Sequence, residues 1–219
     1  MQQITNGPLW LAAAGVTSDY DNRLLDAFRE AHPQLAPNTN DVEEALFNSP
    51  LGTIIRTLNF SLKGRSSDIT KNLRALTKIR APQELLEANT PASKQLAKHT
   101  KPLLKEYERQ LQEAITSDEK NPLFIHVFSD IQQSFVADVA NELLRITDAE
   151  IILVARKDVH RVNLSLRSHD TNLQPLLEEA LQGIDGYGGG HENACGGSIA
   201  TPDWTRFLEA FTQRVHEQL

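Results

Sequence analysis

The segment GYGGGHENACGGSI, residues 186–199, has the composition best suited to binding chemistry in this chain of 219 residues. It places six of the eleven glycines within twelve positions, around one histidine and the single cysteine. Because glycine has no Cβ, it permits positive φ and lets another molecule touch the main chain. Successive backbone N–H groups form an anion-binding nest, often at a helix N-terminus. The segment therefore predicts a loop that binds a phosphate or a nucleotide. The alternative, a flexible surface loop, explains the number of glycines poorly.

His191 and Cys195 lie within this segment, and together their types allow two kinds of chemistry. A cysteine near a histidine can form a nucleophilic pair or half of a zinc site, but no second cysteine completes a zinc site, and spacing across glycines gives no fixed geometry. We therefore expect Cys195 to be a small buried side chain. His191 is expected to donate a hydrogen bond to the anion, because imidazole can be charged or neutral near pH 7.

Arg167 comes at the end of a predicted strand, upstream of the glycines. A guanidinium is always charged and presents a planar fork of donors, which suits a phosphodiester beside an amide nest. An ordinary surface arginine at a strand end is the alternative interpretation.

The elements that must position these residues are expected after residue 117. Residues 122–130 and 150–157 are apolar runs of strand length, and residues 162–168 alternate between apolar and polar side chains. Helical patterns cover residues 131–147, 173–182 and 202–219. The order strand, helix, strand, strand, helix, glycine loop, helix predicts a small α/β domain with a mixed sheet over residues 118–219.

Residues 1–117 have a different pattern, a series of short amphipathic helices separated by proline and glycine. A longer helix is predicted after Thr90, a plausible N-cap, with Pro91 in its first position. Pro102 should kink or split it. We interpret this helix as a connector to the second domain.

The charge is divided unevenly along the chain. The net charge is −7, yet residues 1–117 carry 14 Lys and Arg against 13 Asp and Glu, whereas residues 118–219 carry 8 against 16. Residues 56–80 hold seven cations and one carboxylate, and residues 94–109 carry a second basic stripe. Either stretch is suited to a polyanion. The alternative is a solvated helical face.

The chain has the pattern of a cytosolic protein. Its first residues lack a basic leader followed by a long apolar stretch, and no run is apolar enough to span a membrane. A single cysteine cannot form an internal disulfide, which fits a reducing compartment. We therefore expect a cytoplasmic location and no membrane partner.

The order of two motifs carries a family resemblance. SLRS at 165–168, followed by GGGHENACGGSI at 188–199, resembles the DHHA1 domain of the DHH phosphoesterases, the superfamily of RecJ nucleases and oligoribonuclease-type phosphodiesterases. The resemblance covers roughly residues 120–219, and the preceding helices resemble the connector to the catalytic DHH domain. It implies that the phosphates of a nucleic acid are held by these residues: Arg167, Ser168, Gly188, Gly189, Gly190, His191, Asn193, Gly196 and Gly197.

The same resemblance implies two Mn²⁺ ions, held in the family by Asp and His from four motifs of the DHH domain. This sequence lacks the Asp-His-His motif that names the group. PLWLAAAGVTSDYDN, residues 8–22, is similar to the fourth motif, in which Asp19 would be the one metal ligand on this chain. An aspartate in a turn or at a helix end is the alternative.

Three functions are compatible with these motifs. The first is the substrate-binding subunit of a split RecJ-like Mn²⁺-dependent exonuclease, which binds single-stranded DNA or RNA, is inactive alone and is completed by a separate DHH-containing chain in a heterodimer. The second is an inactive RecJ-like adaptor that contacts replication proteins. The third is a DHHA1-type RNA-binding module such as that of alanyl-tRNA synthetase. The first is preferred because a pure adaptor has little use for Asp19 at a metal site.

Overall fold

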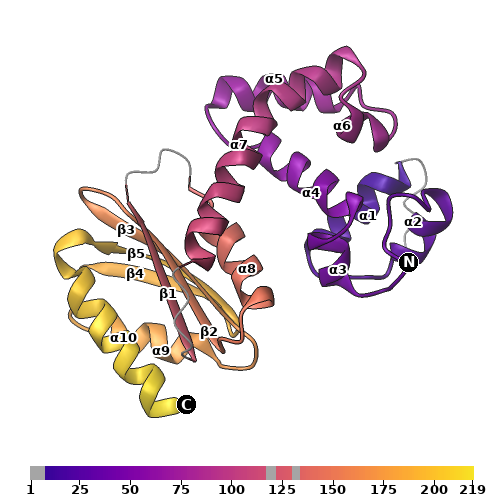
Figure 1. Ribbon diagram of the computed structural model, residues 1–219. Coiled ribbons are helices and arrows are strands. Elements are labelled where there is room, and N and C mark those ends of the chain that lie inside the picture. The colour runs from indigo at the N-terminus through magenta and orange to yellow at the C-terminus, as the bar shows by residue number, and fades with distance from the viewer. Residues whose placement is uncertain (1–7, 117–121, 130–133) are drawn as a thin grey trace, which may run out of the picture. The chain divides into compact units, whose positions relative to one another are not determined.

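The computed structural model describes residues 8–116, 122–129 and 134–219 (Figure 1). The chain forms two compact units, Met1–Lys105 and Glu106–Leu219. Within the described ranges, no helix is both long enough and apolar enough to cross a membrane.

The first unit is helical, as the sequence predicts. Its apolar core contains the fully buried side chains of Leu25, Phe28 and Ile54. Side-chain caps start two of its helices: the Asp41 carboxylate accepts from the Glu43 and Glu44 amides, and the Ser49 hydroxyl accepts from Gly52 N–H. The helices are α1 (Leu9–Ser18), α2 (Leu25–Ala31), α3 (Val42–Phe47), α4 (Pro50–Ser61), α5 (Ser66–Leu76), α6 (Gln83–Glu87) and the first part of α7 (Pro91–Ile115).

Helix α7 starts where its cap residues predict but does not end at its proline. The Ser93 amide donates to Thr90 Oγ1 at 3.2 Å, and the Thr90 amide donates to Ser93 Oγ at 3.0 Å. Of the two outcomes predicted at Pro102, a kink or a split, the split does not occur, because α7 continues to Ile115. Proline removes one backbone hydrogen bond, and the helix is held on either side of it by buried side chains, Leu96 in the first unit and Tyr107 in the second.

The second unit is built on the predicted mixed sheet. Strand β1 (Leu123–Ser129) is parallel to β2 (Ile151–Lys157), and β3 (Arg161–Ser168) is antiparallel to β2. The last two strands are β4 (Gly186–His191) and β5 (Ala194–Ala200), and the order across the sheet is β1-β2-β3-β5-β4. The predicted α/β class with a mixed sheet is confirmed.

Helices lie on both faces of this sheet (Figure 1). Helices α9 (Leu173–Ala180) and α10 (Trp204–Gln218), the latter preceded by the short 3-10 helix Thr201–Asp203, share one apolar core with the sheet, which includes Leu164, Leu166 and Phe207. Helix α8 (Val136–Ile146) packs on β2 and β3. On α8, Glu142 accepts a hydrogen bond from the Tyr107 hydroxyl of α7.

The prediction of a glycine loop is wrong in one respect: residues 186–200 form two antiparallel strands joined by a tight turn at Glu192 and Asn193. Pairing with β5 engages backbone groups of β4 in a ladder, so the amides are not gathered into a nest at a helix N-terminus. β4 lies at the edge of the sheet, and no strand of the described residues pairs with its outer side. The glycines of β4 therefore present an extended, accessible backbone.

Candidate phosphate-binding site

The register of β3, β5 and β4 brings the predicted site residues into rows across the sheet. Arg167 pairs with Ala194, and Ala194 pairs with His191. The next row is Ser165, Gly196 and Gly189, called here the glycine row. Since paired residues of neighbouring strands point to the same face, Arg167, the glycine row and His191 belong to one face of the sheet. Two segments more than twenty residues apart are thus brought together as predicted.

This face is covered only in part. Helix α8 packs against β2 and β3, whereas β4 is exposed from Tyr187 to His191. The glycine row has no side chain beyond a hydroxymethyl group, so a ligand on this face can approach the backbone of β4 and β5 closely. We call this surface the open face.

The glycines divide between the two faces of the sheet, and the division separates two roles. An added Cβ at Gly189 would have no atom within 4 Å, and at Gly196 it would meet only the Leu164 carbonyl oxygen, at 3.4 Å. An added Cβ at Gly188 would instead lie 2.9 Å from Leu177 Cδ2 of α9. The first two glycines therefore leave space for a ligand, and Gly188 leaves space for a helix.

Gly190 and Gly197, like Gly188, have no room for a side chain. A Cβ at Gly190 would overlap the carbonyl oxygen of Ala194, and the φ of 153° at Gly190 is one that side-chain-bearing residues rarely adopt. A Cβ at Gly197 would lie 2.9 Å from the Tyr187 carbonyl oxygen. These glycines are required by the hairpin itself.

The Arg167 guanidinium is oriented by the helix and strand beside it. Its Nε donates to Asn141 Oδ1 on α8, and its Nη1 is 3.4 Å from the Cys195 carbonyl oxygen on β5. Asn141 was not identified from the sequence, because its role depends on α8 crossing β3. The fork is thereby held half-buried at the border between α8 and the open face.

Ser168 and Asn193 fix the end of the hairpin. Ser168 is buried, and its hydroxyl donates to the Thr171 carbonyl oxygen at 2.6 Å. Asn193 Nδ2 donates to Ser168 Oγ at 3.3 Å and to the His169 carbonyl oxygen at 3.0 Å. These bonds tie the turn of the hairpin to the end of β3; a substrate-binding role of Ser168 and Asn193 stays a prediction.

A hollow of about 460 Å³ lies at the tip of the hairpin, lined by Gln174, His191, Glu192, Asn193 and Ala194. The first turn of α9 closes one side of it, because Gln174 Nε2 donates to the Gly190 carbonyl oxygen at 2.8 Å. His191 is exposed there. The imidazole is thus accessible to a ligand that reaches the end of the glycine row.

Tyr187 and Arg161 are functional candidates that sequence reasoning missed. Tyr187 lies two residues before Gly189 on the same strand, so it belongs to the open face, and it is 70% exposed. The Arg161 guanidinium lies 5.5 Å from the centre of its ring and is held by Ser198 and Asp185. Had this segment been predicted as a strand, its period of two would have placed Tyr187 on the same face as Gly189 and His191.

Cys195 is confirmed as a buried side chain. It is 2% exposed, and its thiol donates to the His191 carbonyl oxygen at 3.2 Å. Burial raises the pKa of this thiol above its ordinary value. Since the thiolate is the reactive form, Cys195 is not suited to be a nucleophile at neutral pH.

We predict that Cys195 of the native chain reacts at least about a hundredfold more slowly with an aromatic disulfide reagent than it does after unfolding in guanidinium. The absorbance of the released thiolate measures both rates, and the unfolded chain should release one equivalent. Rapid reaction of the native chain would show that β5 does not stay paired in solution.

Asp19, the predicted metal ligand, follows the last residue of α1 and is exposed. The nearby Asp21 is engaged by Arg23, whose hydrogen bonds hold the pKa of that carboxyl below its ordinary value. Throughout residues 8–116, 122–129 and 134–219, no group of three or more His, Cys, Asp or Glu side chains is placed to hold a metal ion. The described residues therefore do not fit a pair of metal ions.

Residues 120–217 match the family model of the DHHA1 domain. This part of the chain is therefore a DHHA1 domain, and the fold agrees with the DHH/DHHA1 superfamily. No curated protein sequence in the comparison matches the chain.

Solved structures extend the likeness of the fold to nearly all of the chain. RecJ from Thermus thermophilus, crystallised with Mg²⁺, is 16% identical over 95% of this chain and 34% of its own, with a TM-score of 0.63. An exonuclease RecJ bound to manganese is 18% identical over 94% of this chain and 55% of its own, with a TM-score of 0.57. A DHH domain described as belonging to a family of ribosomal proteins is 15% identical over 94% of this chain and 49% of its own, with a TM-score of 0.57. The chain thus spans about a third of the length of the Thermus RecJ structure.

Proposed function

We propose that the chain is the substrate-binding part of a RecJ-like phosphodiesterase that acts on single-stranded nucleic acid. The observation that carries the proposal is the placement of Arg167, the glycine row and the exposed His191 on one face of a DHHA1 domain. A phosphodiester on this face would receive a charged fork from Arg167, a hydrogen bond from His191, and close contact with the backbone at Gly189.

Tyr187 extends this assignment from phosphate to base. Aromatic rings exposed beside a phosphate site stack on nucleic acid bases without reading their identity. Arg161 lies against Tyr187 and fixes the ring while leaving most of it accessible. A nucleotide with its phosphate near Arg167 and its base near Tyr187 would lie along the glycine row.

In this proposal, most ligands of the metal ions belong to another polypeptide. A divalent pair, when bound, would supply the hydroxide nucleophile and the charge that stabilises the leaving oxygen. This chain would hold the phosphate and the base and would contribute Asp19 as one carboxylate. A separate polypeptide with the Asp-His-His motif would provide the remaining ligands.

The test uses the purified chain and a fluorescent oligo(dT) or oligo(rU) of about 20 nucleotides, longer than the roughly 4 to 16 nucleotides of one single-strand site. With Mn²⁺ and no partner, the chain should raise the fluorescence anisotropy and leave the oligonucleotide intact on a denaturing gel. Adding a purified polypeptide that carries the Asp-His-His motif should permit cleavage, and Asp19→Asn should abolish that cleavage with the complex intact. Cleavage by the chain alone, or no binding, would contradict the proposal; binding with no effect of Asp19→Asn would favour an adaptor.

A further inference from the structure

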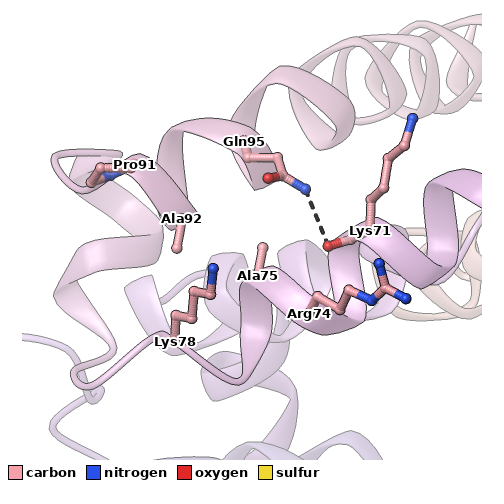
Figure 2. Close-up of a pocket in the computed structure, with 7 residues that line it drawn as sticks. All are labelled: Lys71, Arg74, Ala75, Lys78, Pro91, Ala92 and Gln95. Carbon is pink, nitrogen blue, oxygen red and sulfur yellow. Dashed lines mark hydrogen bonds between the residues drawn. The ribbon is translucent and has the colours of Figure 1, made fainter.

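A basic groove in the first unit has no role in the site described above. It runs between α5 and α7 and consists of two adjoining hollows of about 270 and 430 Å³. Both are lined by Lys71 and Gln95, and the Gln95 side-chain amide donates to the Lys71 carbonyl oxygen at 3.1 Å between them (Figure 2). The two hollows therefore form one continuous surface, called here the α5–α7 groove.

Small residues form its floor and cations form its rim. Ala75 and Ala92 let the two helices approach, and Figure 2 shows Arg74 and Lys78 on either side of Ala75. Four cations line the groove against one carboxylate, that of Asp68; the cations are Lys71, Arg74, Lys78 and Lys98. A local excess of positive charge on a chain of net charge −7 marks a place where an anion is attracted.

These four cations differ from most arginines of the chain. Arg29, Arg109 and Arg214 are each engaged by carboxylates. None of the four groove cations forms an ion pair with any residue in the described ranges of the chain. Their amines and guanidinium are exposed and available to an external anion.

We infer that the α5–α7 groove binds the sugar–phosphate backbone of single-stranded nucleic acid, at a second site additional to the open face; this inference rests on the proposed function. Lys71 and Arg74 lie on α5, and Lys78 lies two residues beyond the last residue of that helix, Leu76. All three line the same hollow, so one strand of nucleic acid can offer them more than one phosphate.

The composition of the groove favours a nucleic acid over an acidic segment of a protein. Protein interfaces depend on aromatic or other large side chains that fill pockets. The lining of the α5–α7 groove offers only alanine and proline as apolar surface, and it contains no Phe, Tyr or Trp. A phosphate backbone needs only charge and donors, so the groove should bind without regard to base sequence.

The test compares two triple variants of the full chain in the anisotropy assay. The first is Lys71→Gln, Arg74→Gln, Lys78→Gln; the control is Lys157→Gln, Arg206→Gln, Arg214→Gln, which removes the same charge from exposed residues outside both basic stretches. At about 50 mM salt the groove variant should bind oligo(dT) at least about tenfold more weakly than the wild type. Its slope of log affinity against log salt should also be smaller by about 2, since each phosphate contact on a single strand contributes roughly 0.7. The control should change affinity less than about threefold.

If the two variants lost the same affinity for the oligonucleotide, the effect would come from net charge and not from the groove, and the inference would be overturned. An unchanged affinity of the groove variant would also overturn it and would make an acidic protein segment the better candidate. No binding by the wild-type chain at any salt concentration would instead be a failure of the proposed function. The substituted residues are exposed, so circular dichroism and the melting temperature should match those of the wild type.

Discussion

Replacement of Arg167 by methionine is expected to weaken binding of a single-stranded oligonucleotide by about tenfold to a hundredfold, because a charge-assisted hydrogen bond is worth roughly 1.5–3 kcal/mol. Methionine retains the length of the side chain and removes the charge and the fork. Arg167→Lys should recover only part of the affinity, since an ammonium cannot reproduce the planar fork. Fluorescence anisotropy with oligo(dT) measures all three dissociation constants.

Arg206→Met is the matched control for this experiment. Arg206 lies on α10, which packs on the opposite face of the sheet, and it pairs with Asp203. The Arg206→Met substitution removes the same charge from the same domain, so its effect on oligonucleotide affinity should stay below about threefold. If Arg167→Met and Arg206→Met weakened binding equally, the guanidinium at the end of β3 would have no specific part in the site. Melting temperatures of both variants separate a loss of binding from a loss of fold, which matters because Arg167 also bonds to Asn141.

The strands that carry Arg167 were predictable because they are long, apolar and flanked by polar turns. Residues 123–129, 151–157 and 161–168 fall within or next to the predicted runs. The periodicity of a strand reflects which of its faces are buried. β2 and β3 lie inside the sheet, and β1, although it forms the other edge, is also largely buried. The same logic fails for β4, which lies at the edge and is exposed. Its six residues, GYGGGH, have almost no side chains from which a period could be read.

The contents of the site could be predicted, but the roles within it could not. Residue type and motif order pointed to Arg167, the glycines and His191, and the sheet places them in neighbouring rows. Which glycine serves a ligand and which serves packing depends on the register between β4, β5 and α9. The hydrogen bonds of Ser168 with Thr171 and Asn193 likewise depend on the folded hairpin.

The α5–α7 groove shows a similar limit. The excess of cations in residues 56–80 is visible in the sequence, but the subset that shares a surface is not. Within this stretch, the Arg56 guanidinium donates to the Phe47 carbonyl oxygen, whereas Lys71, Arg74 and Lys78 line the groove. In the second basic stripe, Arg109 is bound by Glu106 and Glu113. Contacts of each cation with nearby carbonyl and carboxylate oxygens therefore decide which charges are available to an external anion.

Gly190→Ala is expected to have the largest effect on stability of any single methyl addition to the hairpin. The new Cβ would overlap the Ala194 carbonyl oxygen and lie 2.8 Å from Cys195 Cα, and the φ of 153° is unfavourable for alanine. Because both contacts are with backbone, relief requires the hairpin to separate, at a cost of about 2–4 kcal/mol. The melting temperature should fall by roughly 10 °C or more. A change of less than about 2 °C would mean that the turn relaxes freely.

Gly189 provides the matched comparison, one residue earlier on the same strand. An alanine there has open space around its Cβ, so Gly189→Ala should leave the free energy of unfolding within about 0.5 kcal/mol of the wild type. A valine favours the extended backbone and fits the same space, so Gly189→Val should also fold normally. Its side chain would occupy the glycine row, and oligonucleotide affinity should fall by about tenfold, because the ligand can no longer reach the backbone. Unchanged affinity of a stable Gly189→Val variant would place the nucleic acid elsewhere than on the open face.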